Sequence, residues 1–431
     1  MPTFVLSLFL TAFALMAPAS YAAEFNYPDI SPFLATIGGT PESLRAPIPA
    51  EPDIQQEDLQ IRVLPDRKLP PAFRQYSKLG FRVAWHDEPA PLVFLIAGSG
   101  SGYDSARMDH LKALYWQAGM HVIVMSSPTN FDFIAAASTS GLPGLGQRDA
   151  RDLHTAMSLA VERARNVTGL EVTEFRMVGF SLGAMNAAFV SELDEHLGQF
   201  NFTKVLMLNP PVNLYDSVRR LDALSFTHVP GVDGTESFYE HIFDKISRYF
   251  AQTGDTDIES TLFSGIQTSD EALSDDELAM LIGAVFRFAA ADLNFMADLI
   301  NDTGRYAPTG QTITVSTSLT PYLRRALFCD FGCYIRNQLW PDWHSLNAEK
   351  TIEDMAYETS LQSIEEHIAG NPRIAVLTNA DDFILTRADY HYLAETFGER
   401  AFLYPRGGHG GNLEHQQVTA RMLSFLQGAT P

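Results

Sequence analysis

The sequence predicts an α/β fold with an open, mostly parallel central sheet flanked by helices and interrupted once by a long helical insertion. Three observations support this prediction. Strand-like and helical stretches alternate from about residue 90 to 211 and again from 371 onward, as in sheets built with crossover helices. The strand-like stretch Pro91–Gly98 is continuously apolar, which is typical of a strand buried on both faces. Between the two parts, residues 212–370 are dominated by helical periodicity.

The composition favours a globular protein with a large core. The chain has 431 residues, of which 46% are hydrophobic and 11% aromatic, so we expect one large domain or two smaller ones rather than disorder. The formal net charge is -22. An acidic surface disfavours nucleic acid and anionic membranes, because binding phosphate needs clustered Lys and Arg. We therefore expect no nucleic-acid partner, and the composition does not indicate an oligomeric state.

Residues 1–23 have the features of a signal peptide. An apolar run from Phe4 to Met16 is followed by small residues that end at Ala22 and Ala23. The run is too short to span a bilayer comfortably. It departs from the usual pattern because no Lys or Arg precedes it, and the alternative is a buried N-terminal helix. We expect an exported protein, either periplasmic or secreted, with no later transmembrane anchor.

The next segment, residues 24–57, is rich in Pro, Ala and acidic residues and predicts an extended lead-in. The predicted core comprises residues 58–211 and 371–431, and the helical insertion comprises residues 212–370. The strand-like stretches of the core are Leu59–Pro65, Gly80–His86, Pro91–Gly98, 121–127, 174–180, 202–210, Ile374–Thr378 and Ala401–Pro405.

The stretch G-F-S-L-G, from Gly179 to Gly183, stands between a predicted strand and a predicted helix. In this context Ser181 would lie on a sharp, strained turn, whose close neighbours must lack side chains. The two glycines meet that need. The turn would also place Ser181 at a helix N-terminus, which favours developing negative charge. We interpret Ser181 as a nucleophile; the alternative is a helix-capping serine in a tight turn.

A serine nucleophile needs a base and an acid that orients the base. His409 lies in a glycine-flanked loop after the strand Ala401–Pro405, whereas His415 falls within the last predicted helix and is expected at the surface. Asp381 and Asp382 follow the strand that precedes that one. All these positions share the carboxyl edge of the sheet. We prefer Asp382 as the acid because an apolar tail follows it directly, and Asp381 remains the alternative.

Stabilising a carbonyl oxyanion requires two backbone N–H groups. One candidate is Leu182, which follows the predicted nucleophile. The other is Ser99, in the glycine-rich loop from Gly98 to Asp104, where the backbone can approach a substrate closely. A phosphate-binding loop is the alternative, but this loop lacks both the third glycine of the dinucleotide fingerprint and the Lys-Ser/Thr of a P-loop.

Together these motifs resemble the α/β-hydrolase superfamily: LIAGSGSG for the oxyanion loop, VGFSLGA for the elbow, NADDFIL for the acid and GGHGG for the histidine. The resemblance implies an α/β-hydrolase fold in which the insertion 212–370 is a large helical cap or lid. This insertion is longer than is common in the superfamily. The first loop begins Ala97-Gly98, where many members have His-Gly.

The resemblance implies a serine hydrolase that cleaves a carboxylic ester or a related acyl bond through an acyl-enzyme on Ser181, with neither metal nor organic cofactor. The substrate would be a small-molecule or lipid-like acyl compound. A serine peptidase or aminopeptidase, a thioesterase and a non-catalytic secreted binding protein are alternatives. Four apolar residues of the insertion either line an acyl pocket or fill the cap's own core: Phe286, Phe288, Phe295 and Met296.

The two cysteines, Cys329 and Cys333, are four residues apart. In an exported protein this spacing favours a small disulfide loop, with two unpaired thiols on one helical turn as the alternative. A zinc site is not expected, because no further Cys or His stands nearby to complete a ligand set.

Overall fold

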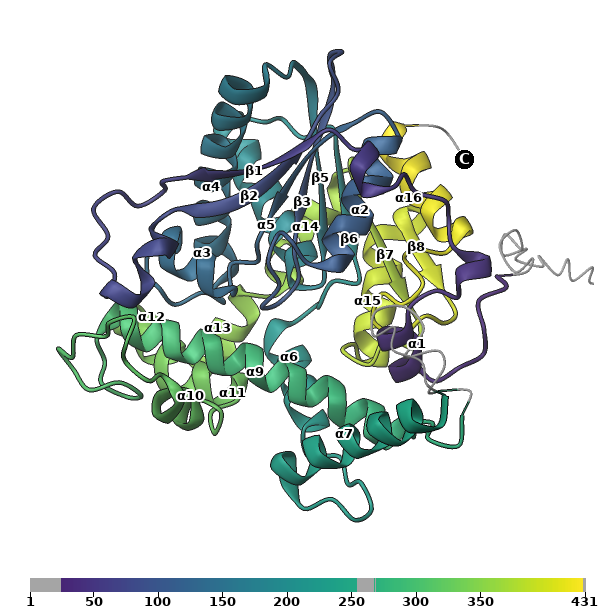
Figure 1. Cartoon of the computed structure of the whole chain (residues 1–431). Coiled ribbons are helices and arrows are strands. Elements are labelled where there is room, and N and C mark those ends of the chain that lie inside the picture. The colour runs from purple at the N-terminus through teal and green to yellow at the C-terminus, as the bar shows by residue number, and fades with distance from the viewer. Residues whose placement is uncertain (1–24, 254–266, 268, 429–431) are drawn as a thin grey trace, which may run out of the picture.

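The computed structural model describes residues 25–253, 267 and 269–428 (Figure 1). The predicted signal peptide, residues 1–23, lies outside the described residues. One eight-stranded sheet forms the centre, in the order β1-β2-β4-β3-β5-β6-β7-β8. The strands are β1 (Gln56–Ile61), β2 (Leu79–Ala84), β3 (Ala90–Ile96), β4 (His121–Met125), β5 (Val172–Phe180), β6 (Lys204–Leu208), β7 (Ile374–Asn379) and β8 (Ala401–Tyr404).

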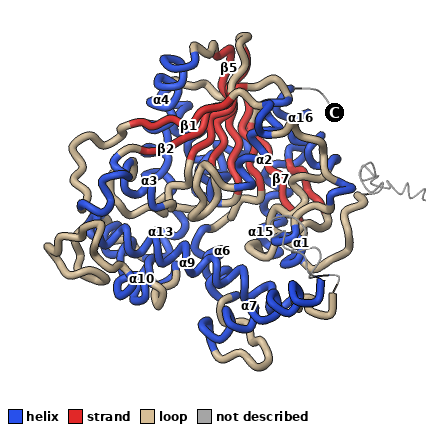
Figure 2. Tube along the Cα trace, in the orientation of Figure 1, coloured by secondary structure: helices blue, strands red, loops and turns tan. Residues whose placement is uncertain are grey.

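The sheet is parallel from β4 to β8, and β2 runs antiparallel to both of its neighbours. Helices cover both of its faces, as the blue helices around the red strands show in Figure 2. The predicted fold class is therefore confirmed. Because parallel strands end at one edge, the loops after β3, β5, β6, β7 and β8 can meet there.

Two hydrophobic cores lie on opposite faces of the sheet. Side chains alternate along each strand, so Phe94 belongs to one core while Val93 and Leu95 belong to the other. The first core lies under α4 (Gly146–Thr168), α5 (Leu182–Leu197) and α15 (Arg387–Phe397). The second lies under α2 (Ala106–Gln117) and α16 (Gln416–Gln427). Three short helices complete the core outside the N-terminal segment: η3 (Pro71–Ser77), α3 (Phe131–Ala136) and η6 (Gly398–Arg400).

The segment expected to be an extended lead-in contains a helix, α1 (Pro32–Gly38), and two 3₁₀ turns, η1 (Glu42–Leu44) and η2 (Glu51–Asp53). Ser31 caps α1 by accepting a hydrogen bond from the Leu34 N–H at 3.2 Å, and Pro32 takes the first position, where its missing N–H costs nothing. The prediction of an extended lead-in is therefore wrong for residues 32–38, where a proline stands at the start of a helix.

The helical segment between β6 and β7 lies along the lower edge of the sheet in Figure 1. Its described helices are α6 (Leu214–Leu224), α7 (Gly234–Thr253), α9 (Asp275–Asn301), α10 (Thr320–Ala326), α11 (Phe331–Tyr334), the π-helical turn η4 (Ile335–Leu339), α12 (Trp340–Leu346), α13 (Ile352–Glu358), η5 (Leu361–Ile364) and α14 (Glu365–Gly370).

Among the described residues, α9 is the one helix long and apolar enough, by length and composition, to cross a membrane. The mean hydropathy of its most apolar window is 1.5, and 56% of that window is buried inside the protein. Core helices meet the same criterion. The sequence analysis predicts no such stretch after the N-terminal segment, whereas α9 meets the criterion by length and composition.

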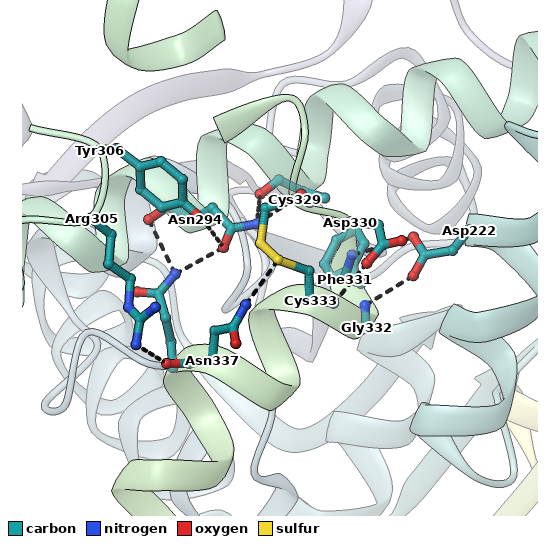
Figure 3. Close-up of a disulfide and its surroundings, with 12 residues drawn as sticks. Asp222, Asn294, Arg305, Tyr306, Cys329, Asp330, Phe331, Gly332, Cys333 and Asn337 are labelled. Carbon is teal, nitrogen blue, oxygen red and sulfur yellow. Dashed lines mark hydrogen bonds between the residues drawn. A yellow bond between two sulfur atoms is a disulfide. The ribbon is translucent and has the colours of Figure 1, made fainter. Parts of the chain in front are cut away.

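Cys329 and Cys333 form the expected disulfide, with Cα atoms 5.2 Å apart (Figure 3). Buried polar side chains hold the short loop that it closes. Asp222 accepts a hydrogen bond from the Gly332 N–H at 2.9 Å, and Asn294 Nδ2 donates to the Cys329 carbonyl at 3.1 Å. The disulfide and these bonds fix the point at which α11 begins.

Candidate active site

Ser181 lies on a strained turn between β5 and α5, with φ 54° and ψ -122°. A positive φ is uncommon for a residue with a side chain. The turn is tight enough to exclude side chains at two neighbours. A Cβ at Gly179 would lie 2.1 Å from the Gly183 carbonyl oxygen, and one at Gly183 would lie 2.3 Å from the Ile96 carbonyl oxygen. Backbone contact therefore explains both glycines of the elbow.

Three predicted side chains meet at the carboxyl edge of the sheet. His409 Nε2 lies 2.9 Å from Ser181 Oγ, and His409 Nδ1 lies 2.9 Å from Asp382 Oδ2. The side chain of Asp382 is fully shielded from solvent, and that of His409 is 13% exposed. The imidazole thus connects a buried carboxylate to a hydroxyl on a strained turn, which is the arrangement that activates a serine.

The two adjacent aspartates point to different partners. Asp381 accepts hydrogen bonds from the N–H groups of Gly407 at 3.1 Å and Gly408 at 2.9 Å, so it braces the loop that carries His409. Burial raises the pKa of Asp381 above its usual value. Of the pair, Asp382 is the residue that contacts the imidazole.

Asn209 is a residue of the site that the sequence patterns did not single out. Its Nδ2 donates to Asp382 Oδ2 at 2.9 Å, and its backbone N–H donates to the Leu377 carbonyl at 2.7 Å. It is completely buried, with φ 49°. Its Oδ1 is also buried and has no hydrogen-bond partner among the described residues. The unsatisfied oxygen destabilises the fold. The hydrogen bond from Nδ2 to the Asp382 carboxylate is the stabilising interaction of this side chain.

The loop after β8 is also held from the side of α2. Arg107 Nη1 donates to the Gly410 carbonyl at 2.5 Å, and its guanidinium lies 4.5 Å from the ring centroid of Phe180. The same ring packs 5.2 Å from the imidazole of His409. The residue before Ser181 and the loop that carries His409 are therefore in contact.

Ser99 and Leu182, the predicted oxyanion donors, line the same cavity beside Ser181. A Cβ at Gly98 would lie 3.2 Å from Ser181 Cβ, so the loop after β3 directly abuts the nucleophile. Thr129 fixes this loop by accepting a hydrogen bond from the Gly100 N–H at 2.9 Å. Leu182 is the first residue of α5, where the backbone N–H groups have no carbonyl partner within the helix.

The cavity is narrow, with a volume of about 20 Å³, and it is lined by Ser99 and Leu182 and by side chains of the helical segment. Helices of that segment supply most of its apolar wall: Leu214 and Val218 of α6, Leu293 of α9, Phe331 and Tyr334 of α11, and Ile335 and Leu339 of η4. This lining suits an apolar chain more than a charged group.

A polar group lies behind one wall of the cavity. Asp149 is completely buried and accepts a hydrogen bond from the Gly144 N–H at 2.7 Å, and burial raises its pKa to about 8. Tyr334 donates to the Pro143 carbonyl at 2.7 Å, whereas the buried hydroxyl of Tyr215 has no partner among the described residues.

The four apolar residues expected from the insertion do not line this cavity. Phe295 and Met296 are buried in the core, the Phe286 ring stacks on Phe331 at 4.3 Å, and Phe288 is exposed. Phe286 therefore packs within the cap, as the alternative expects, whereas the Phe295 ring lies 6.1 Å from that of Phe73, outside the cap. The periodicity of α9 identified its apolar residues but not the stripe that faces the cavity.

His415 is not a surface residue. It caps α16, is 1% exposed, and its Nε2 lies 2.9 Å from Asn26 Oδ1. The helix begins at Gln416, two residues after the expected start at Glu414, so that His415 is the residue that caps it. No group of three or more His, Cys, Asp or Glu side chains within the described ranges could hold a metal ion.

The strand order, the single antiparallel strand β2 and the elbow between β5 and α5 together give this chain the α/β-hydrolase fold. The resemblance seen in the sequence motifs is confirmed at this level. The sequence matches no protein-family model and no curated protein.

Solved structures with a similar fold include two esterases and a peptidase. An esterase of Pyrococcus furiosus is 11% identical over 89% of this chain and 96% of its own, with a TM-score of 0.41. An esterase of Rhizomucor miehei is 12% identical, with coverages of 89% and 85% and a TM-score of 0.41. The proline iminopeptidase of Mycobacterium smegmatis is 13% identical, with coverages of 84% and 97% and a TM-score of 0.38. Identities this low carry no information on activity.

Proposed function

We propose that this protein is a serine hydrolase that cleaves carboxylic esters through an acyl-enzyme on Ser181. One observation carries the proposal: Ser181 Oγ, the imidazole of His409 and the carboxylate of Asp382 form a continuous chain, with 2.9 Å between the atoms of each pair. The strained elbow adds to it, because backbone strain of this kind concentrates at functional sites.

In the proposed reaction, the Ser181 hydroxyl passes its proton to His409 Nε2 while Oγ forms a bond to the ester carbonyl carbon. The carbonyl π electrons move to oxygen, and the N–H groups of Leu182 and Ser99 stabilise the oxyanion. The oxyanion collapses, the bond to the leaving alcohol oxygen breaks, and His409 gives that oxygen its proton. Asp382 stabilises the imidazolium that forms in between.

Water then repeats the sequence. His409 accepts a proton from water as the hydroxide oxygen attacks the acyl carbon, and the bond to Ser181 Oγ breaks as Oγ takes the proton back. The products are a carboxylic acid and an alcohol. Every proton moves between groups already named, so these residues suffice for both half-reactions.

The apolar cavity supports an ester whose acyl group is a hydrocarbon chain. Ser99 and Leu182 line it where the carbonyl would lie, and its further walls come from the apolar side chains of α6, α9 and α11. A small-molecule or lipid-like acyl ester fits this lining. Thioesters and aminoacyl amides react through the same residues and form the principal alternative.

The first test is Ser181→Ala, assayed with p-nitrophenyl esters from acetate to decanoate. We expect turnover to fall to background, while Ser345→Ala, an exposed serine of α12, keeps wild-type activity. A fluorophosphonate probe should label the wild type and Ser345→Ala but not Ser181→Ala. Retained turnover in Ser181→Ala would refute the assignment, and a wild type that neither turns over nor labels would favour the non-catalytic binding protein.

A panel of matched substrates distinguishes the chemical classes. Esters, thioesters and aminoacyl p-nitroanilides of the same acyl chain present the same group to the cavity and differ only in the leaving atom. We expect the highest kcat/KM for the ester. A thioester or an amide that exceeded it tenfold would move the assignment to a thioesterase or a peptidase.

The proposed location is outside the cytoplasm, in the periplasm or the medium. The disulfide between Cys329 and Cys333 supports it, since such bonds persist in oxidising compartments. Mass determination of the N-terminus of the purified mature protein tests it: we expect a chain that starts near residue 23, and a retained residue 1 would contradict export by cleavage.

A further inference from the structure

Thr36 of helix α1 binds the loop that carries His409 through its side-chain hydroxyl. The His409 N–H donates to Thr36 Oγ1 at 2.8 Å, and Thr36 Oγ1 donates in turn to the Pro32 carbonyl at 2.6 Å. The hydroxyl therefore accepts and donates at once, which fixes its orientation toward the loop.

A second hydroxyl holds the same loop four residues further along the chain. Thr40 Oγ1 donates to the Gly411 carbonyl at 2.9 Å, in a bond buried from solvent. The backbones also touch. A Cβ at Gly408 would lie 2.1 Å from the Pro32 carbonyl oxygen, and one at Gly411 would lie 1.9 Å from the Ala35 carbonyl oxygen. These glycines therefore let α1 approach the loop, and the contact is close along its whole length.

The loop makes two short-range backbone bonds of its own, from the Gly410 N–H to the Gly408 carbonyl at 3.1 Å and from the Gly411 N–H to the Gly407 carbonyl at 2.8 Å. Gly407, Gly408 and Gly410 all have positive φ, at 141°, 55° and 76°. Glycines have no side chains to pack and lose the most conformational freedom when they are ordered. The position of His409 therefore also depends on neighbours that bind the backbone of the loop, and Thr36 of α1 and Thr40 just after α1 supply two of those bonds.

Other side chains of α1 reach two further parts of the site. The Phe33 ring packs 5.2 Å from that of Phe383, the residue after Asp382. Leu34 and Ile37 pack against an apolar cluster of the helical segment, formed by Val229, Phe238, Ile242, Leu273, Leu278 and Met280. Helix α1 thus lies between the acid loop, the histidine loop and the cap.

We propose that α1 is a positioning element of the active site and that Thr36 is the positioning residue for His409. This inference rests on the proposed function, since it concerns the base of the same reaction. The hydroxyl of Thr36 sets the imidazole by binding the backbone N–H of His409, and it touches neither substrate nor Ser181.

The test compares three variants of the full chain. Thr36→Val removes the hydroxyl and keeps the shape, Thr36→Ser keeps the hydroxyl, and Thr155→Val is the matched control. Thr155 Oγ1 donates to the Arg151 carbonyl, the same i to i-4 bond that Thr36 makes, on an exposed position of α4. The readouts are kcat and KM for a p-nitrophenyl ester and amide hydrogen exchange of residues 407–411.

We expect Thr36→Val to lower kcat about 10- to 100-fold with little change in KM, because an unpaired N–H at His409 loosens the base and not the acyl cavity. Exchange at residues 407–411 should accelerate by a similar factor. Thr36→Ser should restore both, and Thr155→Val should match the wild type.

Equal kcat and equal exchange in Thr36→Val and Thr155→Val would overturn the inference. The inference would also be overturned if Thr36→Ser lowered kcat as much as Thr36→Val does, since Thr36→Ser keeps the hydroxyl. If the wild type hydrolysed no ester, the proposed function would fail, and the exchange comparison would still decide whether Thr36 holds the loop.

Discussion

Replacing Asn209 with glycine should lower activity although Ser181, His409 and Asp382 themselves are left unchanged. Asn209→Gly removes the Nδ2–H that donates to Asp382 at 2.9 Å. Glycine is the suitable replacement because the position has φ 49°, which other side chains tolerate poorly. A hydrogen bond to a charged group contributes about 1.5 to 3 kcal/mol.

If that contribution is expressed fully in the transition state, kcat/KM falls about 10- to 150-fold, since each 1.36 kcal/mol corresponds to a factor of ten. The assay is steady-state hydrolysis of a p-nitrophenyl ester at pH 7.5, with the fluorophosphonate labelling rate as a second readout. Both depend on the activation of Ser181, so both should fall together.

Asn201→Gly is the matched control for this prediction. Asn201 also has a positive φ, at 51°, and its Nδ2 donates to the Gly198 carbonyl at 2.8 Å on an exposed turn. It therefore reports the general cost of exchanging asparagine for glycine in this conformation. Asn209→Asp should be at least as damaging as Asn209→Gly, because two carboxylates in contact repel each other. If kcat/KM of Asn209→Gly stayed within threefold of Asn201→Gly, the positioning role of the amide would be refuted.

Three further predictions concern stability and substrate range. Exchanging both Cys329 and Cys333 for serine should lower the free energy of unfolding by about 2 kcal/mol for so short a loop, as denaturant titration under oxidising conditions would show. An unchanged midpoint would contradict it. Burial raises the pKa of Asp149 to about 8, so the protein should lose stability as the pH rises from about 4, where an unfolded aspartate ionises, toward 8. The free energy of unfolding of Asp149→Asn should therefore equal that of the wild type near pH 4 and exceed it at pH 8 by on the order of 5 kcal/mol. A constant difference between the two proteins from pH 4 to pH 8 would contradict this prediction. Val218→Phe should narrow the cavity and lower kcat/KM for decanoate at least tenfold relative to acetate, and the same change at the exposed Val167 should alter neither.

The sheet could be predicted because each buried strand is a short apolar run bounded by turn residues. The expected strand Ile374–Thr378 ends one residue before β7 does, and the expected strand Gly80–His86 overlaps β2. The neighbours of β2 could not be predicted, since pairing with β4 instead of β3 depends on how the whole sheet is assembled.

Ser181, Asp382 and His409 were found from sequence because each follows a strand within a distinctive local motif. Asn209 also follows a strand, but its partner Asp382 is 173 positions away, and the two prolines after it suggested only a boundary. The choice between Asp381 and Asp382 likewise needed the position of the loop after β8, which both carboxylates contact.

The helix α1 was missed although a local signal for it exists. Ser31 followed by Pro32 is a helix cap followed by a residue suited to the first turn. The abundance of Pro, Ala and acidic residues outweighed that signal in the sequence interpretation. Its contact with His409 had no local signal at all, because a hydroxyl that binds a distant backbone N–H leaves no pattern near it.

The bonds from Thr36 and Thr40 to the histidine loop join residues 373 and 371 positions apart. A growing chain makes Thr36 early, and Gly411 follows only after nearly all of the sheet and the whole helical segment have been synthesised. Contacts of such separation form late, since the intervening chain must be ordered first. His409 would consequently reach its position beside Ser181 in one of the last steps of folding. Incomplete chains would then contain Ser181 without the imidazole that activates it.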